Sequence, residues 1–264
     1  MTEPFLALDE PPAYGVVNPD GASPYVLLCE HASPRIPRCL GDLGLQEAER
    51  LRHIGWDIGA QALALGLAAA LDAPLFLTNY SRLAIDCNRP LDAASLMPEV
   101  SEATVVPGNR GLTASARRAR IEALHNPYHA AVARRLDARQ AAGLPTLVVG
   151  VHSFTPQFKG NERPWHAGIL FERAEAFGRA LIAALAEDPT LVIAANEPYR
   201  IDTDDYTVPV HGDARGLPAV LLEVRHDLIA DAAGVRDWTA RLSHALRAAQ
   251  THGTSGRLAD RAGR

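Results

Sequence analysis

The sequence lacks the charge pattern and the long hydrophobic runs of proteins that bind nucleic acids or cross membranes. Its 26 Lys and Arg residues are outnumbered by 31 Asp and Glu residues, which gives a formal net charge of −5 with neutral histidines. Nucleic acids and anionic membranes are bound by concentrated basic surfaces, which a mildly acidic chain does not favour. The longest apolar stretch, Ala60–Leu71, is too short to span a bilayer. We therefore predict neither a nucleic-acid partner nor a membrane partner.

Cysteine is scarce and follows no recognisable pattern. The 3 cysteines, Cys29, Cys39 and Cys87, have no CxxC spacing, and an odd number does not suit a disulfide framework. The first 24 residues lack the basic start, apolar centre and cleavage site of a signal peptide. These features predict a cytoplasmic protein in which residues 1–24 form a loose, proline-rich leader.

Several sequence motifs of well-known enzyme classes are also missing. Without a GxSxG motif, a Ser-His-Asp hydrolase is disfavoured. The absence of GxGxxG and P-loop patterns leaves no support for dinucleotide or nucleoside triphosphate binding, and no HExxH zinc motif occurs. A functional site must therefore be inferred from where polar residues fall in the predicted fold.

What the sequence does have is the composition of a globular protein, with 47% hydrophobic and 22% charged residues. Short apolar runs alternate with helical patterns, which predicts an α/β fold with a mainly parallel sheet covered on both faces. We expect one domain over residues 25–250, followed by a flexible tail at residues 251–264. The predicted strands are Tyr25–Cys29, Ala73–Thr78, Thr146–Val151, Ala167–Phe171 and Ala219–Val224, and the predicted helices are Asp57–Leu71, Thr113–Ala142, Arg173–Leu185 and Val235–Ala249.

Polar residues cluster where the predicted strands end. Glu30 and His31 follow the first strand, His152 follows another, and Glu223 ends a third. In an open parallel sheet these ends meet at one edge, where ligands bind. Imidazole and carboxylate groups are the ligands of catalytic zinc, which leave one position open for water. This edge is therefore a candidate metal site for hydrolysis. The long loops at residues 88–112, 154–166 and 196–217 are expected to contribute functional residues, because binding and catalytic residues are often found on loops.

Five short blocks of sequence extend this interpretation. They are Leu28–Ser33 (LCEHAS), His53–Ala60 (HIGWDIGA), Ser81–Pro90 (SRLAIDCNRP), Val151–Phe154 (VHSF) and Leu222–Leu228 (LEVRHDL). In this order they resemble the successive blocks of the N-formylglutamate amidohydrolase family. The resemblance implies a three-layer α/β/α sandwich with a mixed, mainly parallel sheet, of the phosphorylase/hydrolase-like type found in zinc carboxypeptidases. It also implies one zinc ion per chain and a water molecule, activated by the metal, that cleaves the amide between an acyl group and an amino acid.

Carried over to this sequence, the resemblance implies three metal ligands, His31, Asp57 and His152. The third ligand has two alternatives. Asp57 is also well placed to cap the N-terminus of the following helix, which is the commoner role of Asp at such a position. Glu30 would then be the oxygen ligand.

The resemblance also implies that Glu223 is the general base. The alternative is an ion pair with Arg225, but side chains two residues apart on a strand point the same way, so both would line the site. His211, which precedes this strand, is either a group that stabilises a developing oxyanion or a solvent-exposed turn residue.

Three residues of the third block resemble a clamp for the substrate carboxylate, namely Arg82, Asn88 and Arg89. Guanidinium groups provide the planar fork that a carboxylate accepts in two hydrogen bonds. For Arg82, a salt bridge to Asp86 is an equally good interpretation.

These observations together predict a metal-dependent amidohydrolase that acts on a small, carboxylate-bearing N-acyl amino acid such as N-formylglutamate. The protein would be a monomer or a small homo-oligomer. One alternative is a carboxypeptidase-like or deacylating hydrolase that acts on peptides or cell-wall fragments, for which the loops at residues 88–112 and 154–166 would border a wider cleft. Another is a relative that binds ligands without catalysis.

Overall fold

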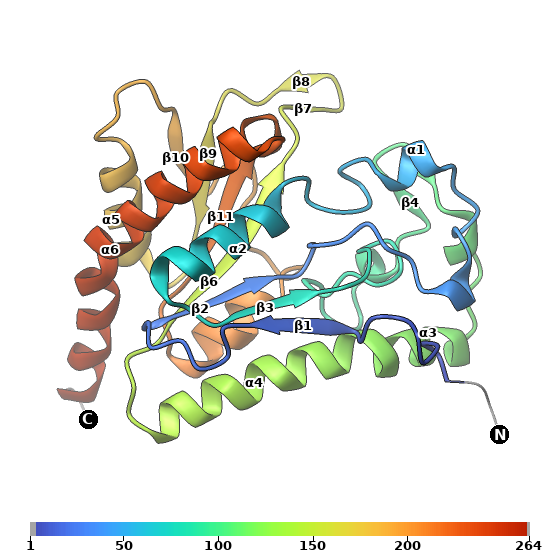
Figure 1. Cartoon of the computed structure of the whole chain (residues 1–264), viewed down its shortest axis with the longest axis horizontal. Coiled ribbons are helices and arrows are strands. Elements are labelled where there is room, and N and C mark those ends of the chain that lie inside the picture. The colour runs from blue at the N-terminus through green and yellow to red at the C-terminus, as the bar shows by residue number, and fades with distance from the viewer. Residues whose placement is uncertain (1–3, 263–264) are drawn as a thin grey trace.

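A seven-stranded sheet crosses the centre of the protein in the computed structural model, which describes residues 4–262 (Figure 1). The outer strand β1 runs antiparallel to β3, and β9 runs antiparallel to β11, whereas the other neighbouring pairs are parallel. The predicted mixed, mainly parallel sheet is therefore confirmed. In spatial order the strands are β1 (Tyr14–Val17), β3 (Leu75–Thr78), β2 (Tyr25–Cys29), β6 (Leu147–Phe154), β11 (Ala219–Arg225), β9 (Ala167–Leu170) and β10 (Ile193–Ala195).

Helices cover both faces of this sheet, as the three-layer prediction requires. One face packs against α2 (Ala60–Leu71), α5 (Glu175–Leu185) and α6 (Ala232–Ala262), which together with the sheet form the largest hydrophobic core. The other face packs against α4 (Asn126–Ala141) and a π-helical turn at Thr207–Gly212. The predicted helix at residues 113–142 is present as α3 (Ala114–Arg120), a π-helical turn (Ile121–His125) and α4 in direct succession.

The loops between the main strands and helices contain several short elements. In residues 4–262, no helix combines the length and the hydrophobicity that a bilayer-spanning segment needs. The short elements are α1 (Glu47–Arg50), the two-stranded ribbons β4 (Val100–Ser101) with β5 (Thr104–Val105) and β7 (Gln157–Phe158) with β8 (Asn161–Glu162), and 3₁₀ turns at Arg38–Leu40, Ala94–Leu96, Pro107–Asn109, Asp213–Arg215 and His226–Ile229.

The central strand β6 explains how an apolar run produces this architecture. All eight of its residues are buried. Alternate side chains serve opposite faces of the sheet, because successive residues of a strand point in opposite directions. Leu147 and Val149 enter the core beneath α2 and α6, whereas Val148 enters the core beneath α4. His152 lies in the same alternating series as Val148, so the strand delivers it to the α4 side.

The two ends of the chain differ from the sequence-based expectation. Residues 14–17 of the expected loose leader form β1, where Tyr14 packs edge-on against Tyr128 and Val17 packs against the main core. At the other end, α6 continues through the expected flexible tail as far as Ala262. The parts of the predicted leader and tail at residues 1–3 and 263–264 lie outside the described residues.

Candidate active site

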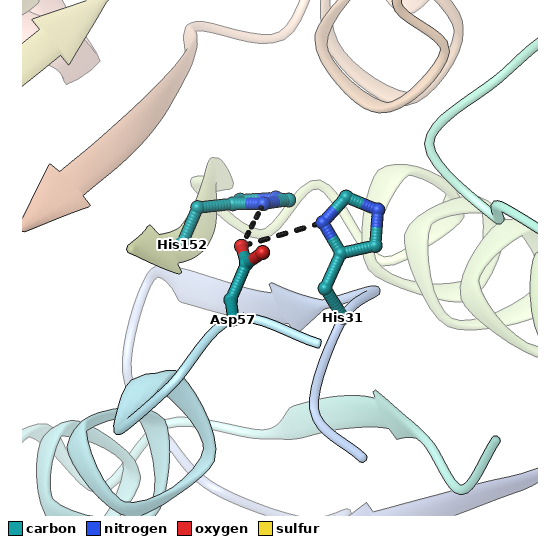
Figure 2. Close-up of side chains that lie close together, drawn as sticks. All are labelled: His31, Asp57 and His152. Carbon is teal, nitrogen blue, oxygen red and sulfur yellow. Dashed lines mark hydrogen bonds and ion pairs between the residues drawn. The ribbon is translucent and has the colours of Figure 1, made fainter. Parts of the chain in front are cut away.

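Two histidines and one aspartate meet at the edge of the sheet where β2 and β6 end (Figure 2). Both imidazoles present Nδ1 to the same oxygen, Asp57 Oδ2, at 3.3 Å from His31 and 2.9 Å from His152. All three side chains are buried, and one possible ligand atom from each lies within 4.8 Å of the others. We call this group the His–Asp–His cluster. The two histidines therefore approach each other as the sequence predicts.

The turn before α2 places Asp57 in this cluster. Gly59 has a left-handed backbone with φ of 80°, and a Cβ atom there would lie 2.3 Å from the Ile229 carbonyl oxygen. Only glycine fits such a position without strain. The helix begins at Ala60, and the Asp57 side chain accepts a hydrogen bond from the Ser153 backbone N–H at 3.3 Å. Asp57 thus faces the histidines instead of capping α2, which answers the helix-cap alternative.

The outer nitrogen of each histidine is bonded to a second buried carboxylate. Asp86 Oδ1 lies 2.7 Å from His31 Nε2, and Glu30 Oε2 lies 3.0 Å from His152 Nε2. The other oxygen of Glu30 accepts hydrogen bonds from the hydroxyls of Tyr128 and Thr207. Glu30 therefore lies behind His152, on the side away from Asp57. Such an outer carboxylate fixes the tautomer and orientation of a metal-binding imidazole.

Arg82 bridges the carboxylates on both sides of His31. Its Nη2 lies 2.6 Å from Asp86 Oδ2, and its Nη1 lies 3.4 Å from Asp57 Oδ1. Burial alone would raise the pKa of Asp86, but Arg82 and His31 outweigh burial and hold this pKa well below its usual range. Asp86 is therefore ionised and able to orient His31. The salt bridge considered as an alternative role for Arg82 is present.

Glu223 lies next to the cluster and has an unsatisfied oxygen. In the register of the parallel pair β6–β11, Glu223 is opposite His152. Its side chain is buried, and Oε2 has no hydrogen-bond partner among the described residues. Burial raises the pKa of Glu223 to about 7, although the nearby His152 opposes the shift. A carboxyl group with such a pKa exchanges protons readily near neutrality.

A cavity of about 350 Å³ opens beside the His–Asp–His cluster. Its size suits a small molecule, since ligand pockets start at about 300 Å³. All three long loops, at residues 88–112, 154–166 and 196–217, contribute residues to its wall. The residues predicted from the sequence that line it are His31, Asp57, Arg82, Asn88, Arg89, His152 and Glu223.

The sequence matches one protein family over most of its length. The profile of the family described as N-formylglutamate amidohydrolase matches residues 23–230. The chain belongs to the N-formylglutamate amidohydrolase family. The resemblance inferred from the five sequence blocks is thereby confirmed, and the chain is a member of a family of hydrolases.

Solved structures share the fold of this chain. The gene product Atu2144 from Agrobacterium tumefaciens is 37% identical, and the match covers 94% of this chain and 98% of that chain with a TM-score of 0.91. An N-formylglutamate amidohydrolase from Ralstonia eutropha JMP134 shares the fold at 20% identity, with coverage of 90% and 97% and a TM-score of 0.67. None of the curated proteins compared with this sequence matches it.

Asn88 and Arg89, in the third N-formylglutamate amidohydrolase block, are held by the loop at residues 204–207. Asn88 Oδ1 accepts the Thr207 backbone N–H at 2.9 Å, and Asn88 Nδ2 donates to Asp205 Oδ1 at 3.1 Å. Arg89 Nη1 lies 3.2 Å from the same Asp205 oxygen and also donates to the Asp204 carbonyl. Both side chains border the cavity while they bind protein groups.

Two further residues predicted to bind substrate lie outside the cavity wall. Arg225 ends β11, and its guanidinium turns back to Asp227 in two hydrogen bonds of 2.8 and 3.2 Å. It therefore pairs with Asp227 and not with Glu223, because the chain leaves the strand at this point. His211 is buried in the π-helical turn, where Nε2 lies 2.9 Å from His129 Nδ1. It is not the exposed turn residue of the alternative interpretation either.

His211 belongs to a buried group of three imidazoles behind the third block. His129 Nε2 donates to the Cys87 carbonyl at 2.8 Å, so its Nδ1 accepts from His211. His125 Nε2 donates to the Arg89 carbonyl at 3.3 Å. Burial lowers the pKa of all three imidazoles, and that of His211 falls to about 4. These neutral histidines fix the backbone on either side of Asn88.

We expect this buried group to make the protein less stable in acid. The ordinary pKa of histidine is 6.5, so at pH 5 the unfolded chain binds a proton at His211 that the folded chain excludes. Stability is unaffected by His211 above pH 6.5 and falls as the pH drops towards 4. For His211 alone the loss between pH 7 and pH 5 is about 2 kcal/mol, which urea unfolding at the two pH values measures.

The matched variants for this test are His211→Gln and His244→Gln. Glutamine still offers an N–H to His129 but does not titrate, so His211→Gln should lose about 2 kcal/mol less than the wild type between pH 7 and pH 5. His244 is exposed on α6, so its variant controls for the loss of a histidine. An unchanged pH dependence in His211→Gln would show that His211 is not kept neutral by burial.

Proposed function

We propose that the protein is a metal-dependent amidohydrolase that cleaves the amide of a small N-acyl amino acid, with N-formylglutamate as the first candidate substrate. The observation that carries this proposal is the buried His–Asp–His cluster with the unpaired carboxyl group of Glu223 beside it. Family membership supports the reaction class. The cavity volume supports a small substrate.

The donor set of the cluster fits a zinc ion. Two imidazoles and one carboxylate are a common set of protein ligands in catalytic zinc sites, where a fourth position stays open. The carboxylates of Glu30 and Asp86 behind the histidines supply the outer hydrogen bonds that such imidazoles make. When bound, zinc acts as a Lewis acid that polarises a carbonyl group and promotes the ionisation of water. One zinc ion per chain is therefore our proposal for the cofactor.

Glu223 performs the proton transfers in this proposal. Its carboxylate accepts a proton from the attacking water molecule, whose oxygen forms the new bond to the acyl carbon. The same proton then passes to the amide nitrogen as the carbon–nitrogen bond breaks, so that a carboxylic acid and a free amine leave. A pKa of about 7 suits both steps, because an efficient general base and acid has a pKa near the working pH.

The substrate side of the cavity is bordered by Arg82, Asn88 and Arg89 in this proposal. Arg82 is fixed by Asp57 and Asp86, and Arg89 is fixed by Asp205. Both arginines therefore form a rigid part of the wall beside the part of the substrate that is not cleaved. An arginine held in this way positions a substrate with little further loss of side-chain freedom on binding.

The substrate class is tested by a panel of N-formyl-, N-acetyl- and longer N-acyl amino acids beside short peptides. We expect release of free amino acid from the small N-formyl substrates and little cleavage of peptides, because a cavity of about 350 Å³ holds only a small molecule. Amine release measured with a fluorogenic reagent provides the rates. Preferential cleavage of peptides would support the carboxypeptidase-like alternative, and binding of the panel without cleavage by the zinc-loaded protein would support a non-catalytic relative.

A further inference from the structure

One arginine of the cavity wall has no partner among the residues that the structure describes. Three arginines line the cavity, namely Arg82, Arg89 and Arg200. The first two bind Asp86 and Asp205, as described above. Arg200 contributes to the cavity wall, is an exposed residue, and forms no ion pair or hydrogen bond with any described residue. The predicted clamp residues thus bind protein carboxylates, whereas Arg200 has all its donors available.

The loop that carries Arg200 is anchored to the neighbouring loop. The preceding residue, Tyr199, stacks on the guanidinium of Arg163, whose Cζ lies 4.6 Å from the ring centre. Arg163 Nη1 also donates a hydrogen bond of 2.9 Å to the Tyr199 hydroxyl. On its other side Arg163 lies 4.6 Å from the ring centre of Phe158. This stack joins the loops around residues 158 and 199, so the backbone next to Arg200 is fixed at the cavity.

The two aspartates that follow Arg200 most closely in the loop, Asp202 and Asp204, have other partners. Asp202 Oδ1 accepts the Asp204 backbone N–H at 2.7 Å, and Asp204 Oδ2 accepts the Ser95 hydroxyl at 2.9 Å. A free guanidinium at the wall of a small cavity is suited to bind a carboxylate in two parallel hydrogen bonds. The guanidinium groups of Arg82 and Arg89 are already bound to three protein carboxylates. Arg200 is therefore the arginine of the wall whose guanidinium is available to a substrate carboxylate.

We infer that Arg200 binds a carboxylate of the substrate and thereby selects carboxylate-bearing substrates. This inference rests on the proposed function, since it names the recognition group of the same cavity. It differs from the sequence-based clamp, in which Arg82 and Arg89 bind the substrate directly. In the structure Arg82 and Arg89 bind protein carboxylates and order the wall; in this inference Arg200 supplies the contact to the substrate carboxylate.

The test compares Arg200→Gln with Arg236→Gln. Arg236 is also exposed and has no partner among the described residues, but it lies on α6 outside the cavity wall. Two readouts are measured on the zinc-loaded full-length protein, the KM and kcat for N-formyl-L-glutamate and the Kd for glutarate. Loss of hydrogen bonds to a charged group weakens binding by about 10- to 100-fold. We expect this rise in KM and in Kd for Arg200→Gln with kcat nearly unchanged, an intermediate rise for Arg200→Lys, and no change for Arg236→Gln.

The two readouts separate this inference from the proposed function. If the wild type binds glutarate through Arg200 but cleaves no N-acyl amino acid, the proposed function is wrong and the carboxylate site stands. If the wild type cleaves N-formylglutamate and Arg200→Gln has unchanged KM and Kd, the inference is wrong and the proposed function stands. Absence of both cleavage and glutarate binding in the wild type would overturn both.

Discussion

Replacement of Glu223 with glutamine is expected to reduce kcat by about two to four orders of magnitude, because general-base catalysis typically contributes about 10²- to 10⁴-fold. An amide has nearly the shape of the carboxyl group but cannot accept the proton. Fold and metal content should persist, because Glu223 lies outside the His–Asp–His cluster and Oε2 has no protein partner to lose among the described residues. Steady-state rates, thermal unfolding and metal analysis of the same preparation provide the three measurements.

Glu187→Gln is the matched control for this variant. Glu187 is an exposed glutamate just beyond α5, so its replacement makes the same chemical change without touching the cavity. Its kcat should equal that of the wild type. If Glu223→Gln loses its metal, Glu223 is a ligand and our assignment as a base is wrong. A near-normal kcat in Glu223→Gln would require another proton acceptor.

Replacement of His31 with glutamine is expected to remove the metal and to lower activity on the order of 10³-fold or more. His31 is a better choice than His152 for this test. Its outer partner, Asp86, keeps the guanidinium of Arg82 at 2.6 Å, so no buried carboxylate loses its only charged partner. Glu30, in contrast, would lose its ion pair with His152 while fully buried, which is strongly destabilising.

Metal content per chain and thermal stability distinguish loss of metal from loss of fold in His31→Gln. We expect a folded protein with zinc far below one equivalent. His53→Gln is a suitable control, because His53 lines the same cavity but does not belong to the His–Asp–His cluster. Full zinc occupancy in His31→Gln would contradict the assignment of the three ligands.

The sheet and the residues at its strand ends could be predicted from the sequence, because short continuous apolar runs are typical of buried strands. β2, β6 and β11 are continuous hydrophobic segments, and the parallel arrangement brings the residues at their ends together. This argument predicts that His31, His152 and Glu223 lie together at one edge of the sheet, and they do so in the structure. β1 and β10 were missed because they are short edge strands of only four and three residues with mixed burial.

The choice among side-chain partners could not be made from local sequence. Glu30 directly precedes His31 in the sequence, whereas Asp57 lies in a separate block. The hydrogen bonds of the structure show that Asp57 faces both histidines while Glu30 lies behind His152. The expectation for Arg225 assumed that strand geometry persists, whereas the guanidinium turns back to Asp227. No periodic pattern in the sequence marks Arg200, since it lies in the irregular loop at residues 196–217. The composition of this loop indicates only that the loop as a whole contributes to function.

The most direct test of the central claim is a zinc titration of protein that has been stripped with a chelator, with the rate of N-formylglutamate hydrolysis as the readout. Our account predicts that the stripped protein is inactive, and that the rate rises linearly with added zinc and levels off at one equivalent per chain. His31→Gln, titrated in parallel, should stay inactive at the same zinc concentrations. A stripped wild-type protein that hydrolyses the substrate at the full rate, with no zinc bound, would contradict the account.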